Sequence, residues 1–375
     1  MVKSFEIMDT TLRDGEQTAG VSFNVSEKLA IAGLLLDELH VDRIEVASTR
    51  VSKGESEAFG RICEWAAGKG CLEKVEALGF VDDGLSVDWI ADGGGKVINI
   101  LAKGSLRHLT KQLRKTPEEH IADISRVLDK AQARGLSANI YLEDWSNGIA
   151  NSQDYVFQLI EALKELPIKR FMLPDTLGVQ NPWSAYGQCL KMRECFPDLH
   201  FDYHGHNDYA MAVANTLAGF NGVHTTVNGL GERCGNASIA AVVAALHDQA
   251  EIRTNIDESR LTHVCKYVES ISGIRIPSNE PVIGENVFTQ SSGVHADGDR
   301  KGNLYVNDLL PELNGAYMDL IDVLKKESAD HKWGEYAYGG YVGIVESIED
   351  YAKVNRDFLD PAIRKELFRT EILTK

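Results

Sequence analysis

The stretch HFDYHGH, residues 200–206, has the composition of a β-strand and ends in two histidines. Its aromatic residues favour the extended conformation. His204 and His206 stand two residues apart, and on a strand such residues face the same side of the sheet. We therefore expect a strand whose carboxyl end presents two imidazoles in one direction.

Runs of this kind, rich in Val, Ile, Phe and Tyr, recur along the chain and bring the number of expected strands to eight. The other seven are FEIM (5–8), VDRIEVAS (41–48), KVEALGF (74–80), KVINILA (96–102), SANIYLE (137–143), KRFMLP (169–174) and GVHTTVN (222–228). Helix-like stretches separate them. The stretch from 24 to 40 begins with Asn24 as a cap and Glu27 three residues on, and the stretch from 116 to 135 has Pro117 near its first turn and Gly135 past its end.

Strands that alternate with helices predict parallel βα units, and eight units predict an α/β protein built on a (β/α)₈ TIM barrel. A doubly wound open sheet is the alternative. We expect the barrel to span residues 1–250, with a crossing segment over 251–310 that is helical at 257–272 and irregular around Pro277 and Pro281. Residues 311–375 are expected to form a smaller, mainly helical C-terminal region.

Composition restricts the function classes. The chain has 375 residues, 43% of them hydrophobic, and a net charge of −17, which argues against binding to nucleic acid. No apolar run reaches the roughly 18 residues of a membrane span, and an apolar segment beginning at Phe5 leaves no room for a signal peptide. The chain has six cysteines and no C-x-x-C pair, so we expect them to be reduced thiols. Reduced thiols are typical of the cytoplasm, and we therefore expect a cytoplasmic enzyme.

Polar residues follow the expected strands, at the end of a barrel where active sites lie. They include Asp9, Arg13, Asp14 and Glu16 after the first strand, Lys103 at the fourth, Glu143 and Asp144 at the fifth, Asp175 and Thr176 at the sixth, and Asn228, Glu232, Arg233 and Asn236 after the eighth. The sequence therefore predicts one polar rim at the carboxyl ends of the strands.

The two histidines indicate a metal site on this rim. Two neutral imidazoles with a carboxylate and an amide oxygen form a mixed nitrogen and oxygen site that suits a divalent metal such as Mg²⁺, Mn²⁺ or Zn²⁺. Arg13 beside Asp14 fits a substrate whose carbonyl oxygen gains negative charge, because metal and guanidinium can share that oxygen. The alternatives are a pair of structural histidines and a surface ion pair.

Two other motifs are less decisive. NGLGERCGN (228–236) fits a dinucleotide loop poorly, since that loop belongs in the first βα turn of an open sheet, and nothing marks its Cys234 as activated. SSGVHADGDRKGNLY (291–305) holds His295, Asp297 and Tyr305 outside the barrel. This segment is either a surface loop or the source of an acid/base group.

Taken together, the motifs resemble the DRE-TIM metallolyase superfamily, in its Claisen-condensing branch of 2-isopropylmalate, homocitrate and citramalate synthases. The resemblance rests on DTTLRDGEQT (9–18), YLEDWSNG (141–148), LPDTLG (173–178), HGHND (204–208), NGLGERCGN (228–236) and GVHADGD (293–299), which occur in the same order. It implies a catalytic barrel, a divalent metal, acetyl-CoA and a 2-oxo acid as substrates, and a homodimer whose C-terminal region contributes to the partner's site.

The resemblance also implies roles for individual residues. The implied metal ligands are Asp14, His204, His206 and Asn236. The implied catalytic residues are Arg13 at the keto oxygen, Glu143 at the catalytic centre, and His295 with Tyr305 from the partner subunit. Thr176 is implied to bind the 2-oxo acid carboxylate, and Asp297 to lie near the substrate.

The acceptor pocket is expected at the ends of the third, fourth and fifth strands, which offer Leu78, Leu101 and Tyr141. These residues are bulky and lack a charge for a second carboxylate, which disfavours 2-oxoglutarate. The sequence favours pyruvate as the acceptor, which gives citramalate. 2-Oxoisovalerate, which gives 2-isopropylmalate, is close behind, because one methylene group changes the discrimination between substrates by only ~1–3 kcal/mol.

The chain departs from these synthases in two ways. The helix expected between HGHND and NGLGER looks about one turn shorter, and we find no C-terminal domain of the feedback-regulated kind, so no amino-acid feedback of that type is expected. Two alternatives stay open: an acyl-CoA lyase of the same superfamily that uses Cys234, and a specialised or inactive relative with a different acceptor.

Overall fold

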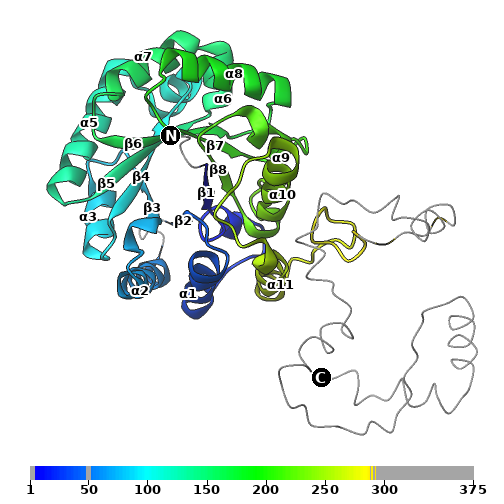
Figure 1. The fold of residues 1–375 in the computed structure, drawn as a ribbon. Coiled ribbons are helices and arrows are strands. Elements are labelled where there is room, and N and C mark those ends of the chain that lie inside the picture. The colour runs from blue at the N-terminus through cyan, green and yellow to red at the C-terminus, as the bar shows by residue number, and fades with distance from the viewer. Residues whose placement is uncertain (1–4, 48–51, 288, 290–291, 293–375) are drawn as a thin grey trace, which may run out of the picture. The chain divides into compact units, whose positions relative to one another are not determined.

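The computed structural model describes residues 5–47, 52–287, 289 and 292, and in them eight parallel strands close into a barrel (Figure 1). The strands pair in sequence order, and β1 pairs with β8 to close the ring. They are β1 (Glu6–Asp9), β2 (Arg43–Val46), β3 (Val75–Phe80), β4 (Val97–Lys103), β5 (Ser137–Glu143), β6 (Ile168–Asp175), β7 (Phe201–Gly205) and β8 (Gly222–Thr225). The predicted (β/α)₈ barrel is confirmed, and the open-sheet alternative is wrong.

Helices surround this ring in Figure 1. They are α1 (Val25–Gly33), α2 (Lys53–Lys69), α3 (Leu85–Asp92), α4 (Leu106–His108), α5 (Pro117–Ala133), α6 (Trp145–Asn151), α7 (Gln153–Leu163), α8 (Pro182–Cys195), α9 (Ala212–Asn215), α10 (Ile239–Ala250) and α11 (Leu261–Ser272). Two π-helical segments continue helices, η2 (Leu34–Glu38) after α1 and η4 (Leu109–Leu113) after α4. Short 3₁₀ turns are η1 (Gly15–Gln17), η3 (Leu72–Lys74), η5 (Thr216–Ala218), η6 (Val227–Gly229) and η7 (Glu258–Arg260).

Helix ends follow the expected local chemistry. The Asn24 side chain accepts hydrogen bonds from the backbone of Ser26 and Glu27, and Glu27 closes a capping box at the start of α1. At α5, Pro117 occupies the first turn, and Gly135 beyond its end has a φ of 71° that glycine tolerates well.

The eighth strand is shorter than the sequence predicts. The run 222–228 was expected to be extended throughout, but β8 ends at Thr225 and η6 follows. Asn228 has a φ of 57°, so the backbone turns there and leaves the sheet. After the barrel, η7 and α11 account for the helix predicted at 257–272, whereas the region 311–375 lies outside the described residues.

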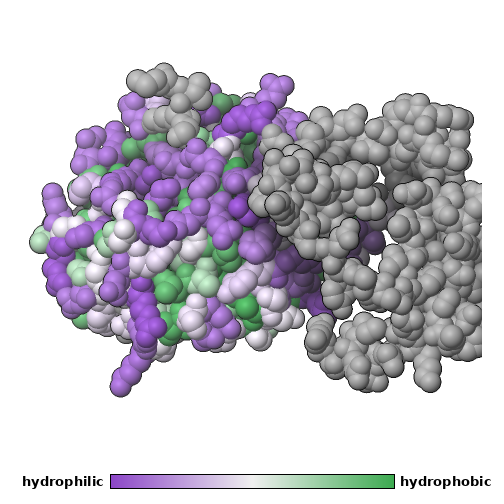
Figure 2. Space-filling view, turned by 60° about the horizontal axis from the view of Figure 1, so that its bottom comes forward, coloured by the Kyte–Doolittle hydropathy of each residue, from purple (hydrophilic) through white to green (hydrophobic). Residues whose placement is uncertain are grey.

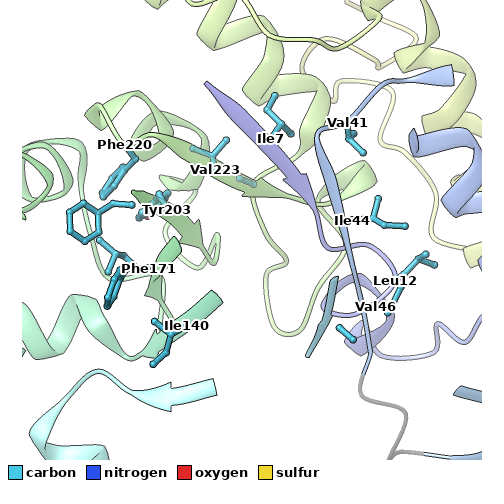
Figure 3. Close-up of a cluster of buried hydrophobic side chains, with 14 of the residues drawn as sticks. Ile7, Leu12, Val41, Ile44, Val46, Ile140, Phe171, Tyr203, Phe220 and Val223 are labelled. Atoms are coloured by element: carbon cyan, nitrogen blue, oxygen red, sulfur yellow. The ribbon is translucent and has the colours of Figure 1, made fainter. Parts of the chain in front are cut away.

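The main hydrophobic core lies between the barrel and its helices. Figure 3 shows Ile7 beside Val223, which are register partners on β1 and β8. In the same figure Tyr203 and Phe220 lie face to face, with ring centroids 5.1 Å apart. Each fully buried side chain of this size contributes roughly 1.5–3 kcal/mol to folding, so this layer supplies most of the hydrophobic stabilisation.

The inside of the barrel is more polar. A small apolar cluster of Met8, Leu78, Tyr141 and Met172 fills part of it. Nearer the amino ends of the strands lies the buried guanidinium of Arg43. It contacts Asp202 at 2.6 Å, Glu6 at 3.2 Å and Glu76 at 3.3 Å.

Arg43 keeps the Asp202 carboxylate charged. Burial alone would raise the pKa of Asp202, but Arg43 outweighs it and holds the pKa well below the usual value. Asp202 is therefore an anion, and its partner Arg43 remains a cation. The barrel interior contains a paired charge cluster instead of a wholly apolar filling.

The surface is mainly hydrophilic on the face that Figure 2 shows, with small hydrophobic areas between charged side chains. Within the described ranges, no helix combines the length and the apolar character that crossing a membrane requires.

Replacing Arg43 with Met is expected to lower the free energy of unfolding by about 3–5 kcal/mol, because it leaves buried carboxylates without a cation. Arg61→Met is the matched control, since Arg61 pairs with Glu57 on the exposed surface and should cost less than about 1 kcal/mol. Urea unfolding followed by circular dichroism measures both. Equal losses in the two variants would contradict the assigned role of Arg43.

Buried His120 makes the fold sensitive to acid. Its Nε2 accepts a hydrogen bond from the backbone N–H of Lys103 at 3.0 Å, and burial lowers its pKa to about 4. The unfolded chain binds a proton near pH 6.5, so stability is complete above that pH and falls as the pH drops from about 6.5 to about 4.

We expect His120→Gln to reduce this acid-dependent loss by about 2 kcal/mol between pH 7 and pH 4.5. The measurement is urea unfolding at a series of pH values. His263→Gln, at an exposed histidine of α11, should leave the pH dependence unchanged. A His120→Gln curve parallel to that of the wild type would show that His120 does not titrate on unfolding.

Candidate metal and substrate site

A cavity of about 270 Å³ opens at the carboxyl ends of the strands. This volume is at the lower end of the range for ligand pockets and suits a small molecule. Its lining combines charged, polar and apolar side chains from several strand ends: Arg13, Asp14, Gln17, Leu78, Phe80, Leu101, Tyr141, Glu143, Pro174, Thr176, His204, His206 and Glu232.

Three predicted ligands meet in this cavity. Potential ligand atoms of Asp14, His204 and His206 all lie within 4.8 Å of one another, and all three residues are buried. His204 Nε2 is 3.0 Å from Asp14 Oδ2. Asp14 follows β1, whereas the histidines end β7 and are exposed to the cavity on the same side, as the period of two predicts.

Asn236, the fourth predicted ligand, lies next to His206. The two residues form an antiparallel bridge, and the backbone N–H of Asn207 donates to Gly235 O at 2.9 Å. The Asn236 amide is buried and its Nδ2 donates to Leu230 O at 3.0 Å. Asn236 lines a neighbouring cavity rather than the first one.

Asp14, His204 and His206 fit a divalent metal, and Asn236 is bridged to His206 beside them. Among the described residues, Asn236 Oδ1 and Nδ1 of each histidine are buried without a hydrogen-bond partner, whereas Asp14 Oδ2 has His204 Nε2 at 3.0 Å. Buried polar atoms normally have partners, so these atoms need an explanation. A divalent cation held by the carboxylate, the amide oxygen and one nitrogen of each imidazole would supply it.

The protonation states also suit metal binding. Burial alone would raise the pKa of Asp14, but Arg13, His204 and His206 together lower it far below its usual value. Burial lowers the pKa of His206 to about 4, and the neighbouring His204 adds to the effect. At neutral pH the site thus contains an anionic carboxylate and a neutral imidazole, which are the forms that bind metals.

Arg13 lies beside this cluster and is fixed by three protein groups. Its Nε is 2.6 Å from Glu45 Oε2, its Nη1 is 2.9 Å from Asp14 Oδ1, and its Nη2 donates to the Tyr141 hydroxyl at 3.3 Å. A guanidinium has five N–H donors, so donors remain for a ligand in the cavity. A fixed cation next to a metal can stabilise an oxygen that becomes negative.

The sequence prediction for Tyr141 was incomplete. Tyr141 lines the cavity as expected, but its hydroxyl belongs to a buried polar network. It donates to Glu45 Oε2 at 3.0 Å and lies 3.1 Å from His224 Nδ1. Tyr141 therefore orients the partners of Arg13 in addition to forming a wall.

Glu45 and His224 are site residues that the sequence reasoning missed. Glu45 is fully buried and also accepts a hydrogen bond from Asn99 Nδ2 at 2.7 Å. A signal was present in VDRIEVAS, where Arg43 and Glu45 alternate with apolar residues and so face the barrel interior together.

The apolar part of the cavity wall consists of Leu78, Phe80, Leu101 and Pro174. Glu143 from β5, which the sequence places at the end of the fifth strand, lines the same cavity. Its carboxylate forms an ion pair with the buried Lys103 Nζ at the end of β4. Lys103 thus pairs with the Glu143 carboxylate.

Thr176 lies at the edge of the cavity, after β6. Its Oγ1 accepts a hydrogen bond from the backbone N–H of Asp144 at 2.9 Å. The guanidinium of Arg233 donates to Thr176 O at 2.7 Å and also pairs with Asp208. These contacts fix Thr176 between the loops that follow β5 and β8.

Gly205 lies between the two histidines because no larger residue fits. A Cβ atom at Gly205 would lie 2.7 Å from the Tyr203 ring. That ring packs on Phe220, and its hydroxyl accepts a hydrogen bond from Asn215 Nδ2 at 3.1 Å.

Some predicted residues are not part of the described cavity. His295, Asp297 and Tyr305 lie outside the described residues. Cys234 is exposed and lines the neighbouring cavity, next to Asn236.

Comparison with protein families supports this assignment of the barrel. The model of the family described as HMGL-like matches residues 4–268, which include all eight strands and α10.

Relatives with this domain are named as synthases of different products. The homocitrate synthase AksA of Methanopyrus kandleri is 38% identical over 77% of this chain and 71% of its own length. The (R)-citramalate synthase CimA of Methanocaldococcus jannaschii is 34% identical over 82% of this chain and 62% of its own. The 2-isopropylmalate synthase 2 of Caldanaerobacter subterraneus is 33% identical over 79% of this chain and 76% of its own length. The matched region spans only about 60% of several curated relatives.

Solved structures share the fold. Hydroxymethylglutaryl-CoA lyase from Pseudomonas aeruginosa superposes with a TM-score of 0.64 at 19% identity, covering 77% of this chain and 99% of that one. The Bacillus subtilis HMG-CoA lyase gives a TM-score of 0.61 at 22% identity, with coverages of 74% and 96%. At such identities the similarity concerns the barrel alone.

The metal-site assignment predicts that Asn236→Ala weakens Mn²⁺ binding at least about tenfold, because one oxygen ligand is lost. Isothermal titration calorimetry with Mn²⁺ measures this. Asn228→Ala is the matched control on the same loop, where the side chain donates to Cys265 O, and it should bind Mn²⁺ like the wild type. Unchanged affinity in Asn236→Ala would remove Asn236 from the site.

Proposed function

Because the chain belongs to the HMGL-like family, we propose that it is an acyltransferase that condenses acetyl-CoA with a small apolar 2-oxo acid. The favoured acceptor is pyruvate, giving citramalate, and 2-oxoisovalerate, giving 2-isopropylmalate, is second. The names of the matched synthases support this reaction class, and they include acceptors of different size and charge.

The observation that carries the proposal is the position of Arg13 beside the metal cluster. Its guanidinium and the ligands Asp14, His204 and His206 line one cavity. A divalent metal held there supplies a Lewis acid for a carbonyl oxygen. Arg13 donates hydrogen bonds to the same oxygen as negative charge develops on it.

The reaction itself needs three steps. A base removes a proton from the acetyl methyl group, the resulting carbanion attacks the 2-oxo carbon, and water cleaves the thioester to release CoA. In our proposal Thr176 holds the carboxylate of the acceptor and Glu143 acts at the catalytic centre. The ion pair with Lys103 holds the Glu143 carboxylate in place.

The cavity wall supports a short apolar acceptor. Leu78, Phe80 and Leu101 lie where the acceptor's side chain would be. Lys103, at the end of β4, already pairs with Glu143. A second carboxylate would compete with Glu143 for that cation, which disfavours 2-oxoglutarate.

The proposal extends to residues outside the described part of the chain. We propose a cytoplasmic homodimer in which His295 of one subunit supplies the acid/base group to the other, with Tyr305 and Asp297 beside it. The division into a barrel at 1–250, a crossing segment at 251–310 and a helical region at 311–375 belongs to the same proposal.

A thiol-release assay with acetyl-CoA and a divalent metal tests the function directly. Pyruvate should give the highest kcat/KM among pyruvate, 2-oxobutyrate, 2-oxoisovalerate and 2-oxoglutarate. Each added methylene should lower kcat/KM roughly tenfold or more. In Leu101→Ala the wider wall should shift the preference towards 2-oxoisovalerate.

Several outcomes would count against the proposal. A preference for 2-oxoglutarate would contradict the assignment of a short apolar acceptor to this cavity wall. Thiol release from acetyl-CoA that persists in a His204→Ala, His206→Ala double variant would contradict the proposed metal site. Cleavage of a 3-hydroxyacyl-CoA that disappears in Cys234→Ser would favour the lyase alternative, for which Cys234 lies exposed beside Asn236.

A further inference from the structure

One exposed segment at the catalytic end of the barrel is basic, although the chain carries a net charge of −17. It comprises α4 and η4, residues 106–113, with the residues that follow as far as Lys115, and it connects β4 to α5. No acidic residue occurs between Lys103 and Glu118. We call residues 106–115 the basic segment.

Three cations of the basic segment are free to bind a ligand. Arg107, Lys111 and Arg114 are exposed, and none forms an ion pair within the described part of the chain. Arg107 lies in α4, Lys111 in the π-helical η4, and Arg114 at the residue that ends η4, with a left-handed φ of 56°. Lys115 differs, because it pairs with Asp123.

The basic segment is attached to the wall of the substrate cavity. Ser105 Oγ donates to Asp144 Oδ2 at 2.7 Å, and His108 Nε2 lies 3.4 Å from the same oxygen. The backbone N–H of Asp144 donates to Thr176, which lines the cavity. This chain of contacts fixes the segment relative to the site.

The segment is also close to the cavity along the chain. Arg107 is six residues beyond the lining residue Leu101, so their Cα atoms lie within roughly 20 Å of each other. A ligand that reaches from the cavity to Arg107 therefore needs only a moderately long arm.

Exposed apolar side chains accompany the cations. Leu106 and Leu113 are each 37% exposed. Each is adjacent in sequence to an exposed arginine, Arg107 or Arg114, so the segment exposes both cationic and apolar groups. Such a surface suits a ligand with phosphates joined to an apolar or aromatic group.

We propose that the basic segment binds the phosphate groups of acyl-CoA, with Arg107, Lys111 and Arg114 as the phosphate ligands. This inference rests on the proposed function, because it assigns a place to the nucleotide of the co-substrate whose thioester enters the cavity. CoA carries a diphosphate and a 3′-phosphate at the end of a flexible arm. In a chain with a net charge of −17, these unpaired cations offer a local attraction for a polyanion.

The test compares two acyl donors in a triple variant, Arg107→Gln, Lys111→Gln and Arg114→Gln. We expect the KM for acetyl-CoA to rise about tenfold, since three partly exposed charge pairs are lost, with kcat unchanged. The KM for acetyl-pantetheine, which lacks the nucleotide, should not change. The KM difference between wild type and variant should also shrink at high salt.

A matched control removes three cations from the other end of the barrel. Lys74→Gln, Lys96→Gln and Lys169→Gln have the same charge change and lie at the amino ends of β3, β4 and β6. This variant should keep the wild-type KM for both donors. Equal KM changes in the two triple variants, or an equal change for both donors, would overturn the proposal.

Binding measurements separate this inference from the proposed function. Calorimetry with CoA and with adenosine 3′,5′-bisphosphate is performed on the wild type and both triple variants. Loss of CoA and bisphosphate binding only in the triple variant of Arg107, Lys111 and Arg114 supports the phosphate site even if no acceptor gives turnover. Suppose instead that the wild type turns over acetyl-CoA and the triple variant of Arg107, Lys111 and Arg114 binds CoA equally well. This result contradicts the phosphate site and leaves the proposed acyltransferase function unaffected.

Discussion

The pairing of β1 with β8 is the constraint on which the site depends. Closure brings the loop after the first strand against the loop after the last one. The backbone N–H of Thr10 donates to Thr225 O at 2.8 Å, Val227 N–H donates to Thr11 Oγ1 at 2.8 Å, and Gly231 N–H donates to Thr18 Oγ1 at 2.7 Å. These bonds join the segment that carries Arg13 and Asp14 to the one that carries Asn236.

Charged side chains are tolerated inside the barrel because they form ion pairs, which are arranged in two layers along the barrel axis. Near the amino ends, Arg43 neutralises the carboxylates around it, and nearer the carboxyl ends Arg13 does the same for Glu45 and Asp14. His224 lies between the two layers, with Nδ1 3.1 Å from the Tyr141 hydroxyl and Nε2 3.4 Å from Asp202. A buried polar network thus connects the interior of the barrel to the site residues, while the apolar layer outside the sheet stabilises the fold.

Much of the fold and part of the site could be predicted from sequence, for physical reasons that differ. Strand composition, caps such as Asn24 and the period of two at His204 and His206 are local, so a single sequence shows them. The partners of Tyr141 and the pairing of Lys103 with Glu143 depend on which strands become neighbours and on side-chain conformations. The early turn at Asn228 was missed because β-branched residues continue up to it.

The central claim is that Asp14, His204 and His206, with Asn236 beside them, hold one divalent metal next to Arg13. The most direct test is anomalous X-ray scattering from crystals of the protein grown with Mn²⁺. The account predicts one strong anomalous peak within ligand distance of Asp14, His204 and His206. A peak elsewhere in the barrel, with none between these three side chains, would contradict it.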